Sequence, residues 1–323
     1  MTLGVTIPCY RQEHFLPRTL AALESALTGR DWRGVLVLAA PGERAALPAL
    51  SERWSVRRPE VSRPLTPGAA RNLGFESCGG DWVLFVDADV EVDAAWIDRA
   101  LSIAASPGAP AGLWGRLEEW FIDGAEERPG VRDLYRLGDT DHDSDYLATL
   151  ALYHRESLES AGRYEPRLSS EEDFELGLRM RQRGHRLRAV TPCAGRHWSA
   201  PRPSFGELSR RWSTGLCFGQ GQVLRLYLGR AGLSQHLARQ WHYLGMLALL
   251  LAAPVAVFAA GPRGLLAWAL APLVLFAVMT LRKRSPRLAL HSLLTWGINT
   301  AGMVVGFIRG GVPVTLAREE AAC

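Results

Sequence analysis

The chain has 323 residues and a formal net charge of +4, with 37 lysines and arginines against 33 aspartates and glutamates. This length can hold one large domain or two, and the small charge, without a recognised binding module, argues against nucleic acid as a partner. The five cysteines include no C-x-x-C pair, which argues against a disulfide framework or structural zinc and fits a reducing compartment. The sequence enters a strand-like run directly, without a signal-peptide pattern, so we expect the N-terminal domain in the cytosol.

Strands and helices are predicted to alternate along the first part of the chain. Apolar runs at 5–8, 34–38 and 82–86 predict buried strands, and helices are expected over 15–27 and 68–77. Strands and helices that alternate with short connections are typical of a parallel sheet covered by helices. The predicted fold class is therefore α/β, with a mostly parallel sheet flanked by helices.

Two aspartates, Asp87 and Asp89, directly follow the third of these strands. Neighbouring carboxylates repel each other unless a cation neutralises them, and a hard divalent ion such as Mg²⁺ or Mn²⁺ prefers oxygen ligands. Such an ion would bridge a diphosphate and absorb charge that develops on a leaving group. Ligands of parallel sheets bind beyond the carboxyl ends of the strands, where Pro8–Tyr10 also falls. A solvated loop is the alternative for an isolated D-x-D pattern, and His197 either completes the metal site, contacts the diphosphate or is structural.

A cluster of acids opens a helix later in the chain. We expect the helix that begins in Ser169–Asp173 to reach about Arg183, before a stop at Gly184. Serine and acidic residues in a first turn also cap a helix and complement its dipole, so the cluster has a structural alternative. Three acids exceed what a cap requires. One of them, Asp173 in preference to Glu172, is expected to accept a proton as a general base.

Three apolar stretches lie near the end of the sequence, at 243–260, 265–281 and 288–308. Each is near or above the length that spans about 30 Å of hydrocarbon, and a hairpin around 261–264 is the alternative for the first two. The connector 282–287 carries four positive charges, which the positive-inside rule places in the cytosol. We therefore expect an α-helical, multi-pass domain of the cell membrane with about three hydrophobic helices, a cytoplasmic catalytic domain and an external C-terminal tail.

The segment before these stretches, residues 205–240, combines apolar residues at helical spacing with arginines. Such helices commonly lie in the lipid headgroup layer, although packing on the catalytic core is the alternative. Trp212 either lines an acceptor groove or anchors the segment at the membrane surface. The predicted domains are thus a catalytic domain at 1–204, interfacial helices at 205–240 and a transmembrane domain at 241–323.

Four groups of residues resemble, in their order and spacing, the family 2 glycosyltransferases. They are Val5–Tyr10 with Glu13, Ala70–Gly74, Gly80–Asp89, and Glu172–Leu176 with Arg179 and Gly184. The resemblance covers about residues 3–215. It implies a GT-A fold, a nucleoside-diphosphate sugar as donor, Mg²⁺ or Mn²⁺ as cofactor, and inversion at the anomeric carbon. The segment 152–165 is also similar, and in that family it helps to form the acceptor side.

The resemblance also implies roles for single residues. Asp89 would bind the metal ion, Asp87 would contact the ribose or the metal, and Asp173 would be the base, with Glu172 beside it. We expect further contacts on the donor side from Pro8, Tyr10, Glu13 and Arg71. On the acceptor side we expect Trp114, His154, Arg211 and Trp212.

Two departures from the family pattern bear on the function. The acidic residue that usually follows the second strand and contacts the base of the nucleotide is missing or displaced to Glu43. The sequence therefore does not predict which base the donor nucleotide carries. Processive members carry Gln-x-x-Arg-Trp, and this chain has Leu208 in place of the glutamine. We therefore expect single transfer to a membrane-associated acceptor, a lipid-linked saccharide or glycolipid hydroxyl. A processive polysaccharide synthase and an inactive sugar-nucleotide-binding subunit of a membrane assembly are the alternatives.

Overall fold

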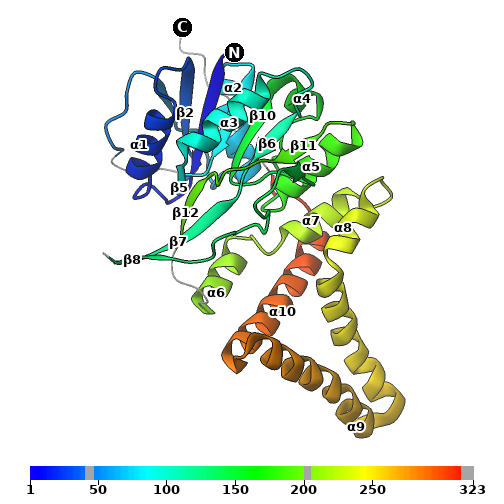
Figure 1. Ribbon diagram of the computed structural model, residues 1–323. Coiled ribbons are helices and arrows are strands. Elements are labelled where there is room, and N and C mark those ends of the chain that lie inside the picture. Colours follow the sequence, from blue (N-terminus) through cyan, green and yellow to red (C-terminus); the bar gives the residue numbers. More distant parts are fainter. Residues whose placement is uncertain (41–46, 125, 200–204, 314–323) are drawn as a thin grey trace. The chain divides into compact units, whose positions relative to one another are not determined.

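The computed structural model describes residues 1–40, 47–124, 126–199 and 205–313 (Figure 1). The chain divides into two compact units. The N-terminal unit comprises Met1–Pro201 together with Val312–Cys323, and the helical unit comprises Arg202–Gly311. The chain therefore leaves the N-terminal unit once and returns to it after the last helix.

A large sheet forms the centre of the N-terminal unit. Its strands within the described residues are β1 (Leu3–Cys9), β2 (Trp32–Leu38), β3 (Trp54–Arg57), β4 (Trp82–Val86), β6 (Gly112–Trp114), β9 (His142–Asp143), β10 (Leu150–His154) and β11 (Leu187–Ala189). They are ordered β3-β2-β1-β4-β10-β6-β11-β9. β1 is parallel to β2 and β4, and β11 is parallel to β6. Because β10 is antiparallel to both β4 and β6, the carboxyl ends of β1, β4, β6 and β11 share one edge of the sheet.

A second, smaller sheet follows directly from the first. It contains β5 (Val90–Val92), β12 (Gly195–Ser199), β7 (Leu117–Asp123) and β8 (Glu126–Pro129), in that order. β12 is antiparallel to β5 and parallel to β7. The turn between β4 and β5 therefore connects the two sheets, and this turn contains Asp87 and Asp89.

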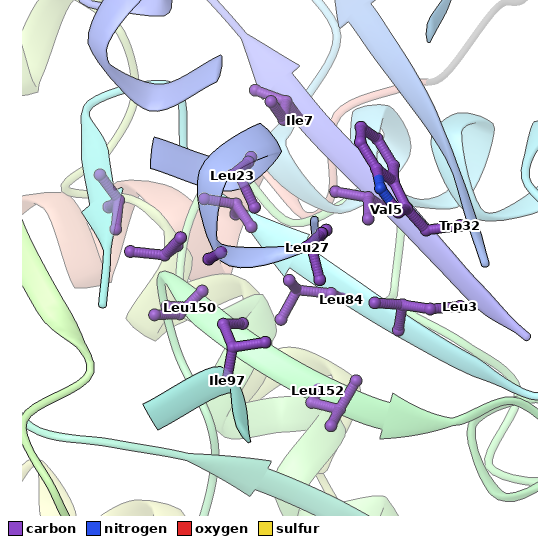
Figure 2. Close-up of a cluster of buried hydrophobic side chains, with 14 of the residues drawn as sticks. Leu3, Val5, Ile7, Leu23, Leu27, Trp32, Leu84, Ile97, Leu150 and Leu152 are labelled. Carbon is purple, nitrogen blue, oxygen red and sulfur yellow. The ribbon is translucent and has the colours of Figure 1, made fainter. Parts of the chain in front are cut away.

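Helices cover both faces of the large sheet. They are α1 (Leu16–Ala26), α2 (Pro67–Ser77), α3 (Ala94–Ala104), α4 (Arg155–Ser160) and α5 (Glu172–Gln182). Alternate residues of each strand enter different hydrophobic clusters: Leu84 packs with α1 and α3 on one face, whereas Phe85 packs with α2 and α5 on the other. Figure 2 shows the first cluster, in which Leu23 and Leu27 point toward side chains of β1, β4 and β10.

Helix α2 lies against β1 because it carries a glycine at the contact. A Cβ atom at Gly74 would lie 1.7 Å from Thr6 Oγ1, which is far inside van der Waals contact. At its start, α2 is capped by Thr66, whose side chain accepts a hydrogen bond from the backbone of Ala69. The close approach and the cap fix the position of Arg71, in the middle of this helix.

The helical unit contains α6 (Phe205–Ser213), α7 (Gly219–Leu226), α8 (Leu233–Arg239), α9 (Trp241–Lys283) and α10 (Pro286–Arg309). Helix α9 is interrupted at Ala260 and Gly261, where the backbone is not helical. Pro262 follows this break, as expected of a residue that lacks the backbone donor of a continuous helix. Within the described residues, α9 and α10 are long and apolar enough to cross a membrane by length and composition.

The predicted fold class is confirmed, and the expected helices at 15–27 and 68–77 correspond to α1 and α2. The expected strands correspond to β1, β2 and β4. The sequence did not predict β3, which pairs with β2 at the sheet edge, or the small sheet beside β5. The first two apolar stretches lie in the two limbs of α9, and the third lies in α10.

Candidate active site

The backbone of the turn that carries Asp87 and Asp89 is held by hydrogen bonds to three other segments. The amide of Asp87 donates to the carbonyl of Thr149 over 2.9 Å, and the hydroxyl of Thr19 donates to the carbonyl of Ala88 over 2.8 Å. The amide of Trp198 donates to the carbonyl of Asp89 over 2.9 Å. Each carboxylate therefore projects from a backbone whose position is fixed at the edge shared by the parallel strands.

Arg71 joins the strand-end acids to the acids at the start of α5. Its guanidinium donates to Asp87 Oδ1 over 2.9 Å and to Glu172 Oε1 over 2.6 Å, and it lies 3.5 Å from Asp173 Oδ1. Arg71 is only 5% exposed, and its guanidinium stays protonated throughout the physiological pH range. A single buried cation thus draws together carboxylates that lie far apart in the sequence.

Asp173 and Glu172 differ in their access to solvent. The Glu172 side chain is 8% exposed and is paired with Arg71 at short range, whereas the Asp173 side chain is 20% exposed. Burial raises the pKa of Asp173 well above its usual value; Arg71 opposes this shift, and the charges of Glu172 and Asp87 add to it. Asp173 is therefore the more accessible of the two acids, and burial makes it a stronger base than a free aspartate.

The residue before this pair has an uncommon backbone conformation. Glu171 has φ +66° and occupies the left-handed region, which costs energy in a residue with a side chain. Strained residues of this kind persist where the surrounding structure holds them and cluster at functional sites. The turn at Glu171 sets the direction in which α5 begins, and hence the positions of Glu172 and Asp173.

Asp89 faces a different set of partners from Asp87. Gln12 donates a hydrogen bond to Asp89 Oδ2, and Nε2 of His197 lies 3.6 Å from the same oxygen. Asp89 Oδ1 is buried and has no hydrogen-bond partner among the described residues. Burial raises the pKa of Asp89 to about 6, against the opposing influence of His197. A carboxylate in this environment gains from a bound cation.

The donor atoms at Asp89 fit Mg²⁺ or Mn²⁺ only in part. A carboxylate oxygen and an imidazole nitrogen are suitable ligands, and Ser199 Oγ lies 3.1 Å from Nδ1 of His197, which leaves Nε2 to face Asp89. The part of the chain that the structure describes holds no group of three or more His, Cys, Asp and Glu side chains arranged for a metal ion. The fit therefore depends on further ligands from a substrate or water, which is typical of Mg²⁺ sites.

Aromatic side chains cluster at the carboxyl end of β6. Trp114, at the carboxyl end of β6, is buried and lies with its ring centroid 5.3 Å from that of Tyr135 and 5.5 Å from that of Tyr146. Burial raises the pKa of Tyr135 above its usual value, and the charges of Asp87 and Asp173 act in the same direction. The hydroxyl of Tyr135 is hydrogen-bonded to Thr149 Oγ1, and the carbonyl of Thr149 accepts from the amide of Asp87, so Tyr135 is joined to the turn that carries Asp87 and stays neutral. Sequence reasoning missed it, because no local pattern marks it.

The expected donor-side residues lie where β1 ends. Pro8 is the penultimate residue of that strand, Tyr10 packs against the second core cluster, and Glu13 accepts a hydrogen bond from Cys9 Sγ over 3.7 Å. Sequence reasoning missed Gln12, which contacts Asp89 from the same segment. Its position directly after a parallel strand was the available signal. Glu43, the possible base contact, lies outside the described residues.

His154, which is expected on the acceptor side, lies at the opposite end of β4 from Asp87. In the antiparallel pairing of β10 with β4, His154 is opposite Trp82, at the start of β4, whereas Asp87 follows the end of β4. Its Nδ1 lies 3.1 Å from Ser157 Oγ, so the structure gives it a local role at the start of α4. Two further expected acceptor residues, Arg211 and Trp212, belong to α6 of the helical unit.

One family model matches the N-terminal part of the chain. Residues 5–162 match the family described as Glycosyl transferase family 2. Over 108 residues the chain is 30% identical to an undecaprenyl-phosphate 4-deoxy-4-formamido-L-arabinose transferase from Pseudomonas syringae pv. syringae (strain B728a). That match covers 32% of this chain and 32% of the length of that relative.

Solved structures share the fold at low sequence identity. A mannosyltransferase from Pyrobaculum calidifontis, solved in complex with GDP-Man and Mn²⁺, superposes with a TM-score of 0.51 at 15% identity, covering 95% of this chain and 86% of that chain. TarS from S. aureus superposes with a TM-score of 0.50 at 15% identity, covering 73% of this chain and 68% of that chain. The N-terminal unit of this chain therefore contains a glycosyltransferase domain of family 2, with a GT-A fold.

Proposed function

We propose that this protein transfers a sugar, with inversion, from a nucleoside-diphosphate donor to a membrane-associated acceptor. The observation that carries the proposal is the ion network of Arg71, which links Asp87 at the strand ends to Asp173 at the start of α5. One set of acids, Asp87 and Asp89, lies where a diphosphate would bind at the edge of the sheet. A separate acid, Asp173, is available to the incoming nucleophile.

In the proposed reaction a hydroxyl oxygen of the acceptor attacks the anomeric carbon of the donor sugar. The bond between that carbon and the diphosphate oxygen breaks, and the nucleoside diphosphate leaves. Asp173 takes the proton of the attacking hydroxyl. Its raised pKa supports this role, because a general base works best when its pKa lies near the working pH. Holding both substrates in line supplies much of the remaining rate enhancement.

Asp89 and His197 are the residues that would hold Mg²⁺ or Mn²⁺. A bound ion would neutralise charge on the departing diphosphate. The orphaned oxygen of Asp89 supports this assignment, since a buried carboxylate without a partner is costly unless a cation reaches it. Asp87 is already paired with Arg71 and would contact the ribose or the donor phosphates from that position.

The acceptor is proposed to be membrane-associated because of the apolar helices α9 and α10. The arginines and lysine at 282–287 support a location of the catalytic unit on the cytoplasmic face. The acids near Asp173 favour a hydroxyl acceptor, such as a lipid-linked saccharide or glycolipid. A polyprenyl-phosphate acceptor is the second candidate, favoured by the name of the P. syringae relative. Such a phosphate is already ionised and needs no general base.

A panel of nucleotide sugars, tested with and without Mn²⁺ for thermal stabilisation of the purified protein, examines the donor step. A matching donor at 100 times its Kd should stabilise the protein by about 2.7 kcal/mol. The D89N variant should lose the Mn²⁺-dependent part. The matched control is D98N, because Asp98 lies exposed on α3 in an ion pair with Arg30.

Two results would contradict the proposal. No stabilisation by any donor would contradict the use of a nucleotide-sugar donor, and an equal Mn²⁺-dependent response of D89N would contradict the role of Asp89 as a metal ligand. Stabilisation by a donor without any transfer would favour the inactive sugar-nucleotide-binding subunit. Product length then separates single transfer from a processive synthase, since a ladder of long chains would mean repeated addition.

A further inference from the structure

Helix α9 presents a long apolar surface that the rest of the protein leaves uncovered. Only 6% of its most apolar 18-residue stretch is buried, and Phe258 is 95% exposed. Exposed apolar surfaces of this size mark contact with lipid or with another protein. The ends of α9 favour lipid: exposed Trp241 begins the helix, and Arg282 and Lys283 end it. Tryptophan at one end and basic residues at the other are typical of a segment bounded by lipid headgroups.

The path of the chain limits how it can cross a bilayer. The amide of Val312, directly after the helical unit, donates a hydrogen bond to the carbonyl of Arg167 over 2.7 Å, and both residues belong to the N-terminal unit. Val312 and Pro313 also line a cavity of about 200 Å³ together with residues 61–66 of that unit. The chain therefore leaves and rejoins the same unit, on one side of the membrane. The number of crossings between these points must be even.

Contacts within the helical unit identify α10 as the stretch that does not cross. Near the start of α10, the ring of His291 lies 5.5 Å from that of Phe205 on α6. At its end, Arg225 of α7 donates to the carbonyl of Ile308 over 2.7 Å. The sequence from 202 to 240 holds no apolar stretch that could span a membrane, so the chain does not cross the bilayer between the N-terminal unit and α9, and α6 and α7 share the membrane side of that unit. Both ends of α10 lie there too.

Helix α10 also packs closely against other parts of the helical unit. Two of its glycines allow close approach: a Cβ at Gly302 would lie 2.4 Å from the carbonyl oxygen of Cys217, and a Cβ at Gly306 would lie 2.0 Å from that of Phe218. Asn299 is buried and donates to the hydroxyl of Tyr243, at the start of α9, over 3.0 Å. One face of α10 therefore packs against the start of α7 and the first turn of α9.

The two limbs of α9 meet at a turn at Gly261 and Pro262 and diverge from it in a V (Figure 1). At 1.5 Å per residue the limbs 241–260 and 262–283 are about 30 and 33 Å long, enough to cross the hydrocarbon layer. They are tied together, because Trp268 Nε1 donates to the carbonyl of Leu249 over 2.7 Å. Near the turn, a Cβ at Gly264 would lie 1.9 Å from the carbonyl oxygen of Ala256.

From these contacts we infer that α9 crosses the bilayer twice as a helical hairpin, while α10 stays on the side of the catalytic unit. The hydrocarbon of the bilayer is the partner of the α9 surface, and Arg263 at the turn reaches the opposite headgroup layer. This topology replaces the three spans expected from hydropathy. It rests on the proposed membrane association and makes the hairpin the element that anchors the enzyme beside its acceptor.

Single cysteines labelled with a membrane-impermeant maleimide in sealed, oriented vesicles test the topology. The background carries serine at Cys193 and Cys323, keeps the buried native cysteines, and serves as the unlabelled control. The four exposed test positions are S102C on α3 of the N-terminal unit, R263C at the turn, R287C at the start of α10 and G311C after its end. We expect labelling of S102C, R287C and G311C from one face, and of R263C from the other face only.

Several outcomes would overturn the inference. Labelling of G311C from the face opposite to S102C would mean three crossings, and labelling of R287C from that opposite face would mean that α10 crosses. Labelling of R263C from the same face as S102C would mean a re-entrant loop. Recovery of the protein as a soluble oligomer, without detergent, would mean that a second copy covers α9. The labelling does not require transfer activity, so failure of the proposed reaction and failure of the topology are separate results.

Discussion

Removing the buried cation at the centre of the site should strongly destabilise the protein. Arg71 lies 2.6 Å from Glu172, 2.9 Å from Asp87 and 3.5 Å from Asp173, and the R71M variant would leave these carboxylates without their shared partner. Breaking a buried pair by removing one member costs about 3–5 kcal/mol. Because Asp87 and Asp173 keep some access to water, we expect the lower end, about 3 kcal/mol. For a domain of this size that corresponds to a fall in Tm of about 6–12 °C.

The assay is thermal unfolding of the purified protein, followed by tryptophan fluorescence at pH 5.5 and pH 7.5. Burial already raises the pKa of Asp173 and Arg71 opposes that shift, so without Arg71 the pKa of Asp173 in the folded protein should rise further above that of the unfolded chain. A group of this kind loses its stabilising contribution as the pH rises through the folded pKa, so the deficit should be larger at pH 7.5. Adding E172Q to R71M should restore part of the stability, because a buried charge is removed.

The matched control is R163M, which breaks an ion pair with Glu76 whose side chains are 36% and 51% exposed. Exposed pairs contribute about 0–1 kcal/mol, so its Tm should fall by at most about 4 °C. A fall in R71M no larger than that in R163M, with no dependence on pH, would refute the view that Arg71 balances the acids.

Two further predictions follow from the same geometry. G74A should lower the free energy of unfolding by about 2 kcal/mol, because the added Cβ meets Thr6. The control G79A should be nearly neutral, because a Cβ at Gly79 meets open space. Equal unfolding curves of the two variants would show that α2 can move away from β1. The affinity for Mn²⁺, measured by calorimetry in the presence of the donor, should fall about tenfold per pH unit below pH 6, because a proton then occupies Asp89 in the metal-free protein. A flat affinity between pH 5 and 7 would remove Asp89 from the ligand set.

Local signals in the sequence were sufficient for the elements that carry the site. The apolar run before Asp87 predicts a strand, and a parallel strand places its following residues at the ligand-binding edge. The acids before Phe174 predict a helix start, and α5 begins at Glu172. The glycine of the Ala70–Gly74 group has a physical reason in the structure, because no side chain fits between α2 and Thr6.

Contacts between distant segments could not be read in the same way. The pairing of Arg71 with Glu172 joins positions 101 residues apart, so no spacing rule relates them. Tyr135 is joined to the turn of Asp87 through Thr149, and it lies in a connection without regular secondary structure. Hydropathy marks three apolar stretches but does not report that the chain returns to its first unit at Val312. His154 lies in a segment that resembles the family, but the strand register pairs it with Trp82, at the end of β4 opposite to Asp87. The sequence motif alone does not report this register.

The most direct test of the account measures transfer by D173N with the matched donor and acceptor under single-turnover conditions. General bases contribute about 10²–10⁴-fold, so the rate of transfer should fall by at least two orders of magnitude while the Kd for the donor stays within about twofold of that of the unchanged protein. The rate should not recover when the pH is raised, because the amide cannot ionise. A rate near that of the unchanged protein, with a hydroxyl acceptor and normal donor binding, would contradict the assignment of Asp173 as the base.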